Sequence, residues 1–128
     1  MSIKSPQTLI AESLNSVKTI SPEEALDLAK ENKCNLIDIR DKNELENQGS
    51  IENTFHISRG LLEFSIHPDS AFATNNKIDP NKEIVLFCAA GGRSALAAKT
   101  LIEMGFKKVS HIDGGFGLMI QKGFKIKT

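Results

Sequence analysis

Apolar and polar positions along the chain follow two alternating patterns. Short runs rich in Ile, Val, Leu and Phe, bounded by polar or turn residues, predict strands. Between them, apolar residues spaced three and four apart predict helices. The predicted strands are 17–20, 35–40, 53–58, 83–88 and 107–112, and the predicted helices are 22–31, 41–48, 93–104 and 116–122. This alternation predicts an α/β fold with a mostly parallel five-stranded sheet and helices on both faces.

Local signals mark where several of these helices begin and end. Ser21 is placed as an N-cap, Pro22 stands at the first helical position, and Glu24 is placed to complete a capping box. Asp41 precedes the second helix as its cap. Gly105 is expected to end the third helix.

Two segments stand outside this alternation. Residues 1–16 form an N-terminal extension that we expect to be helical, ahead of a single domain over residues 17–128. The insert, Leu61 to Asn81, is rich in Ser, Asn, Asp and Pro with scattered apolar residues. We expect the insert to lie over the edge or rim of the sheet without adding to the core.

Composition narrows the class of protein. The 128 residues suit one domain, and 16 basic residues balance 16 acidic ones, so we expect no nucleic-acid or membrane partner. The N-terminus lacks a signal-peptide core and no stretch is long enough to span a bilayer, which predicts a cytoplasmic protein. Cys34 and Cys88 match no zinc spacing and are expected to stay reduced, so we predict no metal, cofactor or disulfide.

The candidate chemistry lies in the segment that follows the fourth predicted strand. Cys88 ends that strand, and Ala89, Ala90, Gly91 and Gly92 carry no side chain larger than a methyl group before Arg93 and Ser94. Small residues let backbone N–H groups turn toward one anion, and a helix N-terminus lowers the pKa of a thiol placed there. Arg93 would close the loop with charge, and Ser94 would cap the following helix. A lone cysteine is more often a buried apolar residue, but the combination favours a reactive thiol.

The chain from Val17 to Gly123 resembles a single-domain rhodanese. The resemblance rests on four segments: LIDIRDKNEL (36–45), GSIENTFHISRG (49–60), CAAGGRSALAAKTLIEMGF (88–106) and VSHIDGGF (109–116). It implies a parallel-sheet α/β fold, Cys88 as the catalytic cysteine, and Cys88 through Arg93 as the active-site loop. Four residues separate Cys88 from Arg93. Rhodanese loops have this length, whereas the related phosphatases and arsenate reductases add a residue to hold a tetrahedral oxyanion.

The resemblance implies a two-step sulfur transfer. The Cys88 thiolate takes a sulfur atom from thiosulfate or a persulfide donor, and the loop N–H groups stabilise the persulfide. Cyanide, a small thiol or a sulfur-carrier protein then removes that sulfur atom. Arg93 and Arg59 are candidates to hold a charged donor, and Arg59 matches the arginine after the third strand of many rhodaneses.

Other polar residues near the predicted site are expected to be structural. Asp38 and Arg40 match a family motif that organises the fold near the active site, and His56 and His111 are expected to be hydrogen-bonded strand residues. Cys34 is expected to be a buried apolar residue, though it could resolve a persulfide if it approached Cys88.

Two departures from the family affect the expected substrate preference more than the chemistry. Gly49, Ser50 and Ile51 replace a common Gly-His-Ile segment, and the chain has no tryptophan after the Gly-Gly turn, where it carries Phe116 and Leu118. Two alternative functions stay open. One is a sulfur-relay or protein-binding module that docks through the insert, and the other is a phosphatase or arsenate reductase.

Overall fold

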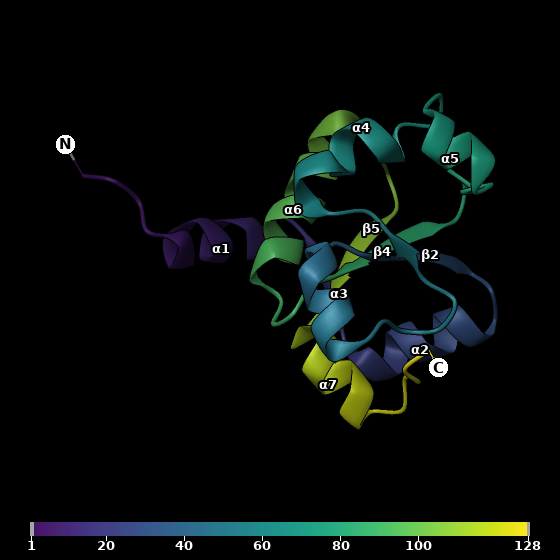
Figure 1. Cartoon of the computed structure of the whole chain (residues 1–128). Coiled ribbons are helices and arrows are strands. Elements are labelled where there is room, and N and C mark those ends of the chain that lie inside the picture. The colour runs from purple at the N-terminus through teal and green to yellow at the C-terminus, as the bar shows by residue number, and fades with distance from the viewer. Residues whose placement is uncertain (1, 128) are drawn as a thin grey trace.

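A computed structural model describes residues 2–127 of the chain (Figure 1). Five parallel strands form one sheet in the order β1-β5-β4-β2-β3. The strands are β1 (Lys18–Ile20), β2 (Cys34–Asp38), β3 (Phe55–His56), β4 (Glu83–Phe87) and β5 (Val109–Ile112). The helices are α1 (Pro6–Leu14), α2 (Pro22–Lys30), α3 (Lys42–Gln48), η1 (Arg59–Leu61), α4 (Leu62–Ile66), α5 (Ala71–Asn75), α6 (Gly92–Met104) and α7 (Gly115–Gln121). The predicted α/β fold with a parallel sheet is therefore confirmed.

Helices cover both faces of the sheet and create two apolar cores. One core packs α6 and α4 against the sheet through residues such as Ala98, Leu101 and Leu86. The other packs α2 and α7 against the opposite face, through Ala25, Met119 and Val85. Neighbouring residues of β4 therefore face different cores, which is why this strand is apolar along almost its entire length.

Most of the helix caps that the sequence predicted are confirmed by the structure. The Ser21 hydroxyl accepts a hydrogen bond from the backbone N–H of Glu24, and Asp41 forms a capping box with Glu44. The prediction for Ser94 is wrong, because α6 begins at Gly92 and its N-cap is Gly91. Gly91 adopts a φ of +107°, so the N-cap of α6 lies three residues before Ser94, the cap that the sequence predicted.

The insert corrects a second prediction, because part of it belongs to the core. Leu62 and Ile66 are fully buried in the core that α6 covers, while Ala73 of α5 is also buried. Leu62 and Ile66 lie four residues apart and so share one face of α4, whereas Leu61 and Phe64 remain exposed. The polar composition of the insert concealed this short apolar face.

Helix α1 packs against α6 and leads away from the body of the molecule toward the N-terminus (Figure 1). Ser5 caps it through the backbone N–H of Thr8, and Ser13 is buried where the helix meets the domain. Ile10 points at the first turn of α6, because a Cβ atom built on Gly92 would lie 2.8 Å from its Cδ1 atom. The N-terminal extension therefore forms a helix beside the loop that follows Cys88.

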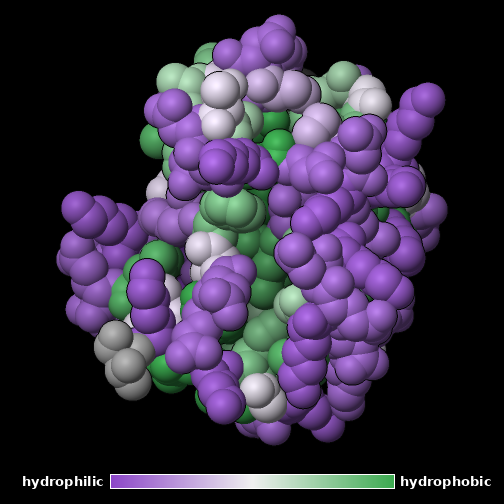
Figure 2. All heavy atoms as spheres, turned by 90° about the vertical axis from the view of Figure 1, so that its right-hand side faces the viewer, coloured by the Kyte–Doolittle hydropathy of each residue, from purple (hydrophilic) through white to green (hydrophobic). Residues whose placement is uncertain are grey.

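The surface turned to the viewer in Figure 2 is largely hydrophilic, with a narrow strip of hydrophobic residues between two hydrophilic flanks. Across residues 2–127, the structure contains no helix that is both long enough and apolar enough to cross a membrane.

The buried face of α4 gives a test of the insert's structural role. Leu62→Ala should lower the free energy of unfolding by about 2–5 kcal/mol, because it leaves a cavity in the main core. Leu61→Ala is the matched control: Leu61 is 59% exposed, so its change should stay within about 0.5 kcal/mol. Urea denaturation of both variants measures the difference, and equal effects would mean that the insert does not belong to the core.

Candidate active site around Cys88

Cys88 follows directly after β4, near the middle of the sheet. The carboxyl ends of parallel strands meet at one edge of a sheet, where open α/β folds bind their ligands. The side chain of Cys88 is 1% exposed and lies on the α6 side of the sheet. A buried thiol at this edge is in the position that the sequence predicted for the candidate nucleophile.

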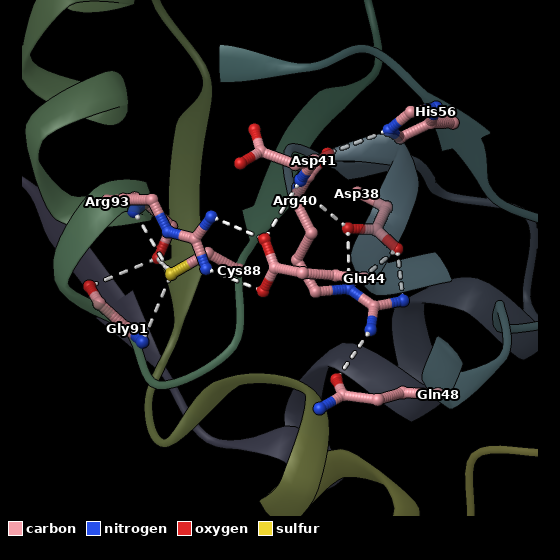
Figure 3. Close-up of polar contacts among 10 residues, drawn as sticks. Asp38, Arg40, Asp41, Glu44, Gln48, His56, Cys88, Gly91 and Arg93 are labelled. Atoms are coloured by element: carbon pink, nitrogen blue, oxygen red, sulfur yellow. Dashed lines mark hydrogen bonds and ion pairs between the residues drawn. The ribbon is translucent and has the colours of Figure 1, made fainter. Parts of the chain in front are cut away.

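Backbone N–H groups of the loop point at the sulfur of Cys88 (Figure 3). The N–H of Gly91 donates to Sγ over 3.1 Å, and the N–H of Ser94 donates over 3.4 Å. These donors stand at the N-terminus of the 13-residue helix α6, where the helix dipole favours negative charge. The first N–H groups of a helix have no acceptor within the helix, so those of Gly92 and Arg93 can also serve an anion. The loop therefore surrounds the sulfur with hydrogen-bond donors.

The turn that follows β5 packs against the backbone of this loop. Gly115 adopts a φ of +63°, and a Cβ atom at this position would lie 2.5 Å from the backbone of Ala89 and from the carbonyl oxygen of Cys88. The backbone N–H of Phe116 donates to that same Cys88 carbonyl over 2.8 Å. The turn after β5 can approach the loop this closely only because Gly115 has no side chain.

Arg93 pairs with an acidic residue that sequence reasoning did not select. Its guanidinium donates two hydrogen bonds to the carboxylate of Glu44 in α3, over 2.7 and 2.9 Å, and Figure 3 shows the two side chains facing each other. The hydrogen bond from Arg93 lowers the pKa of Glu44 to about 2. The same pairing raises the pKa of Arg93, which keeps it charged beside Cys88. The sequence did not indicate this role for Glu44, because 49 residues separate it from Arg93.

Asp38 and Arg40 form a buried ion pair beneath this site. Both side chains are fully buried, and the guanidinium contacts both carboxylate oxygens over 2.8 to 3.1 Å. Arg40 also donates to the carbonyl oxygen of Gly49 and packs over the ring of Phe116 at 3.9 Å. The pair thus links β2 to the end of α3 and to α7. His56 bonds to the Arg40 carbonyl oxygen over 2.8 Å, which fixes β3 beside it.

Ser94 and His111 lie behind the sulfur atom of Cys88. The Ser94 hydroxyl oxygen is 3.6 Å from Cys88 Sγ and 3.0 Å from Nδ1 of His111. Nε2 of His111 is 2.9 Å from the hydroxyl oxygen of Thr19 in β1. Burial lowers the pKa of His111 below its ordinary value. The sequence predicted a hydrogen-bonded histidine here but could not show that its partner touches Cys88.

The side chain of Arg59 forms its hydrogen bonds with residues outside the Cys88 loop. Its guanidinium donates to Glu63 over 2.9 Å and to Thr100 over 3.3 Å. Thr100 lies eight residues after Gly92 in α6, which is about 12 Å along the helix axis. These contacts join η1, α4 and α6, and the part of Arg59 in substrate binding stays a prediction.

Cys34 lies at the other end of the sheet. It starts β2 and pairs in register with Glu83 of β4, five residues before Cys88, which corresponds to about 16 Å along a strand. It also faces the opposite core, and burial raises the pKa of its thiol to about 11. A disulfide requires the two Cα atoms to lie within about 7 Å, so Cys34 cannot resolve a persulfide on Cys88.

Among residues 2–127, no three side chains of His, Cys, Asp or Glu gather closely enough to bind a metal ion.

The ion pair between Glu44 and Arg93 should make stability depend on pH. Because the folded-state pKa of Glu44 is lowered to about 2 from 4.5, its contribution is fully present above about pH 4.5 and disappears as pH falls toward 2. Urea denaturation of wild type and Glu44→Gln should therefore differ at pH 7 and converge near pH 2. Glu46→Gln, which removes an exposed partner of Lys42, should show little difference at either pH. A constant gap between wild type and Glu44→Gln down to pH 2 would contradict this assignment.

Comparison with known proteins places this geometry in a family. Residues 21–120 match the rhodanese-like domain family. The chain is 35% identical over 112 residues to a tRNA uridine(34) hydroxylase from Chlamydia trachomatis, covering 87% of this chain and 32% of the hydroxylase. This chain thus spans about a third of the length of such relatives. It is also 32% identical over 99 residues to a thiosulfate sulfurtransferase from Coxiella burnetii, covering 77% of this chain and 83% of that enzyme.

A solved structure resembles the whole chain. A protein of unknown function from Rhodopseudomonas palustris, described as a possible tyrosine phosphatase, shares 37% identity and superposes with a TM-score of 0.84. The match covers 99% of this chain and 98% of that protein. With the family match over residues 21–120, the parallel sheet and the cysteine loop at its edge, the chain belongs to the rhodanese-like domain family.

Proposed function

We propose that this protein is a sulfurtransferase that moves a sulfane sulfur from thiosulfate or a persulfide donor to a thiol or cyanide through a persulfide on Cys88. The observation that carries the proposal is the pair of N–H groups, from Gly91 and Ser94, that donate to Cys88 Sγ. Such donors stabilise a thiolate more than a neutral thiol, because hydrogen bonds to a charged acceptor are about twice as strong. The similarity to the thiosulfate sulfurtransferase from Coxiella burnetii supports the same chemistry.

In the first half of the reaction, the Cys88 thiolate attacks the outer sulfur of thiosulfate. A bond forms between Sγ and that sulfur, the sulfur–sulfur bond of thiosulfate breaks, and sulfite leaves with the electron pair. The transferred sulfur carries a negative charge, which the N–H groups of Gly92 and Arg93 at the start of α6 are placed to stabilise. The charge of Arg93 adds to this stabilisation.

In the second half, an acceptor thiolate or cyanide attacks the outer sulfur of the persulfide. The bond between the two sulfur atoms breaks, and Cys88 leaves as the thiolate that began the cycle. Neither half requires a general base at the reacting sulfur, because the nucleophile and the leaving group are both anions. The acceptor thiol, including one on a sulfur-carrier protein, must reach the edge of the sheet at which Cys88 lies.

The structure gives a reason to prefer sulfur transfer to phosphate chemistry. A phosphatase would use the planar guanidinium of the loop arginine to hold two oxygens of the phosphate group. In this protein Nη1 and Nη2 of Arg93 already donate to the Glu44 carboxylate, so a phosphate would have to compete with Glu44 for the guanidinium. A persulfide needs no such clamp, since backbone N–H groups suffice for one sulfur atom.

The exposed part of the insert favours a second role as a docking surface. Leu61 and Phe64 are 59% and 77% exposed on η1 and α4, beside the buried face that anchors them. Apolar side chains in this position are suited to contact another protein. A sulfur relay that delivers its cargo to a docked carrier protein therefore remains the alternative to a free small-molecule enzyme.

The persulfide can be tested directly by mass spectrometry. Wild-type protein incubated with thiosulfate should gain the mass of one sulfur atom and lose it when cyanide is added. Cys88→Ser should gain nothing, whereas Cys34→Ser should behave as wild type, because Cys34 lies at the other end of the sheet. Failure of the wild-type protein to gain sulfur from any sulfane donor would contradict the proposed function.

A phosphatase assay separates the remaining enzymatic alternative. We expect no hydrolysis of an aryl phosphate above background, since Glu44 holds Arg93. Hydrolysis that disappears in Cys88→Ser would instead assign the site to phosphate.

A further inference from the structure

Cys88 is buried, yet its thiol must lose a proton before the first sulfur transfer can begin. Its side chain is 1% exposed, and the side chains of Ser94 and His111 behind it are also buried. Thr19 in the edge strand β1, by contrast, is exposed to solvent. A continuous series of hydrogen bonds connects these four side chains.

We propose that Ser94, His111 and Thr19 form a proton path that carries the thiol proton of Cys88 to solvent at the edge of the sheet. The proposal rests on the proposed function for its purpose, but its geometry is independent of the sulfur donor. It assigns a role in the reaction to three positioning residues behind the nucleophile.

Each step of the path corresponds to a contact in the structure. The thiol of Cys88 can donate to Ser94 Oγ over 3.6 Å, and Ser94 Oγ lies 3.0 Å from His111 Nδ1. His111 Nε2 lies 2.9 Å from Thr19 Oγ1. The register of the sheet places Thr19 directly beside His111, so the last contact is fixed by the pairing of β1 with β5.

The chemistry of these groups allows a balanced transfer. The thiol proton moves to Ser94 Oγ while the Ser94 hydroxyl proton moves to Nδ1 of His111. The proton on Nε2 moves to Thr19 Oγ1, and the Thr19 hydroxyl releases its own proton to water. The net change is one thiolate in the site and one proton in solvent, while the other groups keep their charges and reverse their hydrogen bonds.

The neutral form of His111 is the form that this path requires. A neutral imidazole has one accepting and one donating nitrogen, whereas an imidazolium would donate from both. Burial lowers the pKa of His111, and Asp113 partly offsets this effect. The Ser94 hydroxyl also lies 3.2 Å from the Gly91 carbonyl oxygen, so its hydrogen can turn toward either acceptor as the thiol ionises.

A spectroscopic experiment tests whether Cys88 and His111 are coupled. The ring nitrogens of ¹⁵N-labelled His111 should shift when iodoacetamide alkylates Cys88, because the alkylated sulfur can no longer donate to Ser94. In Ser94→Ala, alkylation should leave these nitrogens unchanged. Identical His111 spectra before and after alkylation of the wild type would overturn the proposal.

A kinetic experiment tests the outer end of the path. Thr19→Val keeps the shape of the side chain but removes its hydroxyl. It should slow alkylation of Cys88 at neutral pH by about tenfold when the alkylating agent is concentrated enough that loss of the thiol proton limits the rate. The effect is smaller than the roughly hundredfold loss of a full general base, because water can take over part of the route. Thr19→Ser should restore the rate, and Thr74→Val on the exposed surface of α5 is the matched control.

The outcomes separate this proposal from the proposed function. Alkylation needs the thiolate but no sulfur donor, so an unchanged alkylation rate in Thr19→Val, with an unchanged melting temperature, would overturn the proton path alone. Failure of the wild type to gain sulfur from any donor, with normal coupling between Cys88 and His111, would overturn the sulfurtransferase assignment alone.

Discussion

The hydrogen bonds from the backbone N–H groups of Gly91 and Ser94 to the sulfur of Cys88 are the interaction on which the site depends. They require the chain to turn into α6 at once after β4, which Gly91 permits with its positive φ. The remainder of the site can be understood as support for this one arrangement.

That support comes from elements on both faces of the sheet. Gly115 allows the turn after β5 to press against the backbone of Ala89, and the N–H of Phe116 holds the Cys88 carbonyl. Phe116 in turn packs on Arg40, whose buried pairing with Asp38 connects β2 to α7. Because a buried ion pair is costly to break, this connection favours a single arrangement of the strand ends around the loop.

Function and stability share residues in this protein. Glu44 holds Arg93 near Cys88 and also completes the capping box of α3, so one carboxylate fixes both a helix start and a charge in the candidate site. His111 is a buried residue of β5, and the Ser94 hydroxyl connects it to the sulfur of Cys88. Such sharing is expected in a small domain, where few side chains separate the core from the edge of the sheet.

The sequence alone determined the α/β fold, most element positions and the cysteine loop, because apolar periodicity, helix caps and small-residue loops are local signals. Two predictions from local composition were wrong. Leu62 and Ile66 of the polar insert are buried in the core, and α6 begins before Ser94. Only the tertiary structure decided the partners of distant residues. The pairing of Arg93 with Glu44, the contact of His111 with Thr19 and the separation of Cys34 from Cys88 all depend on how parallel strands and helices come together, which no local pattern encodes.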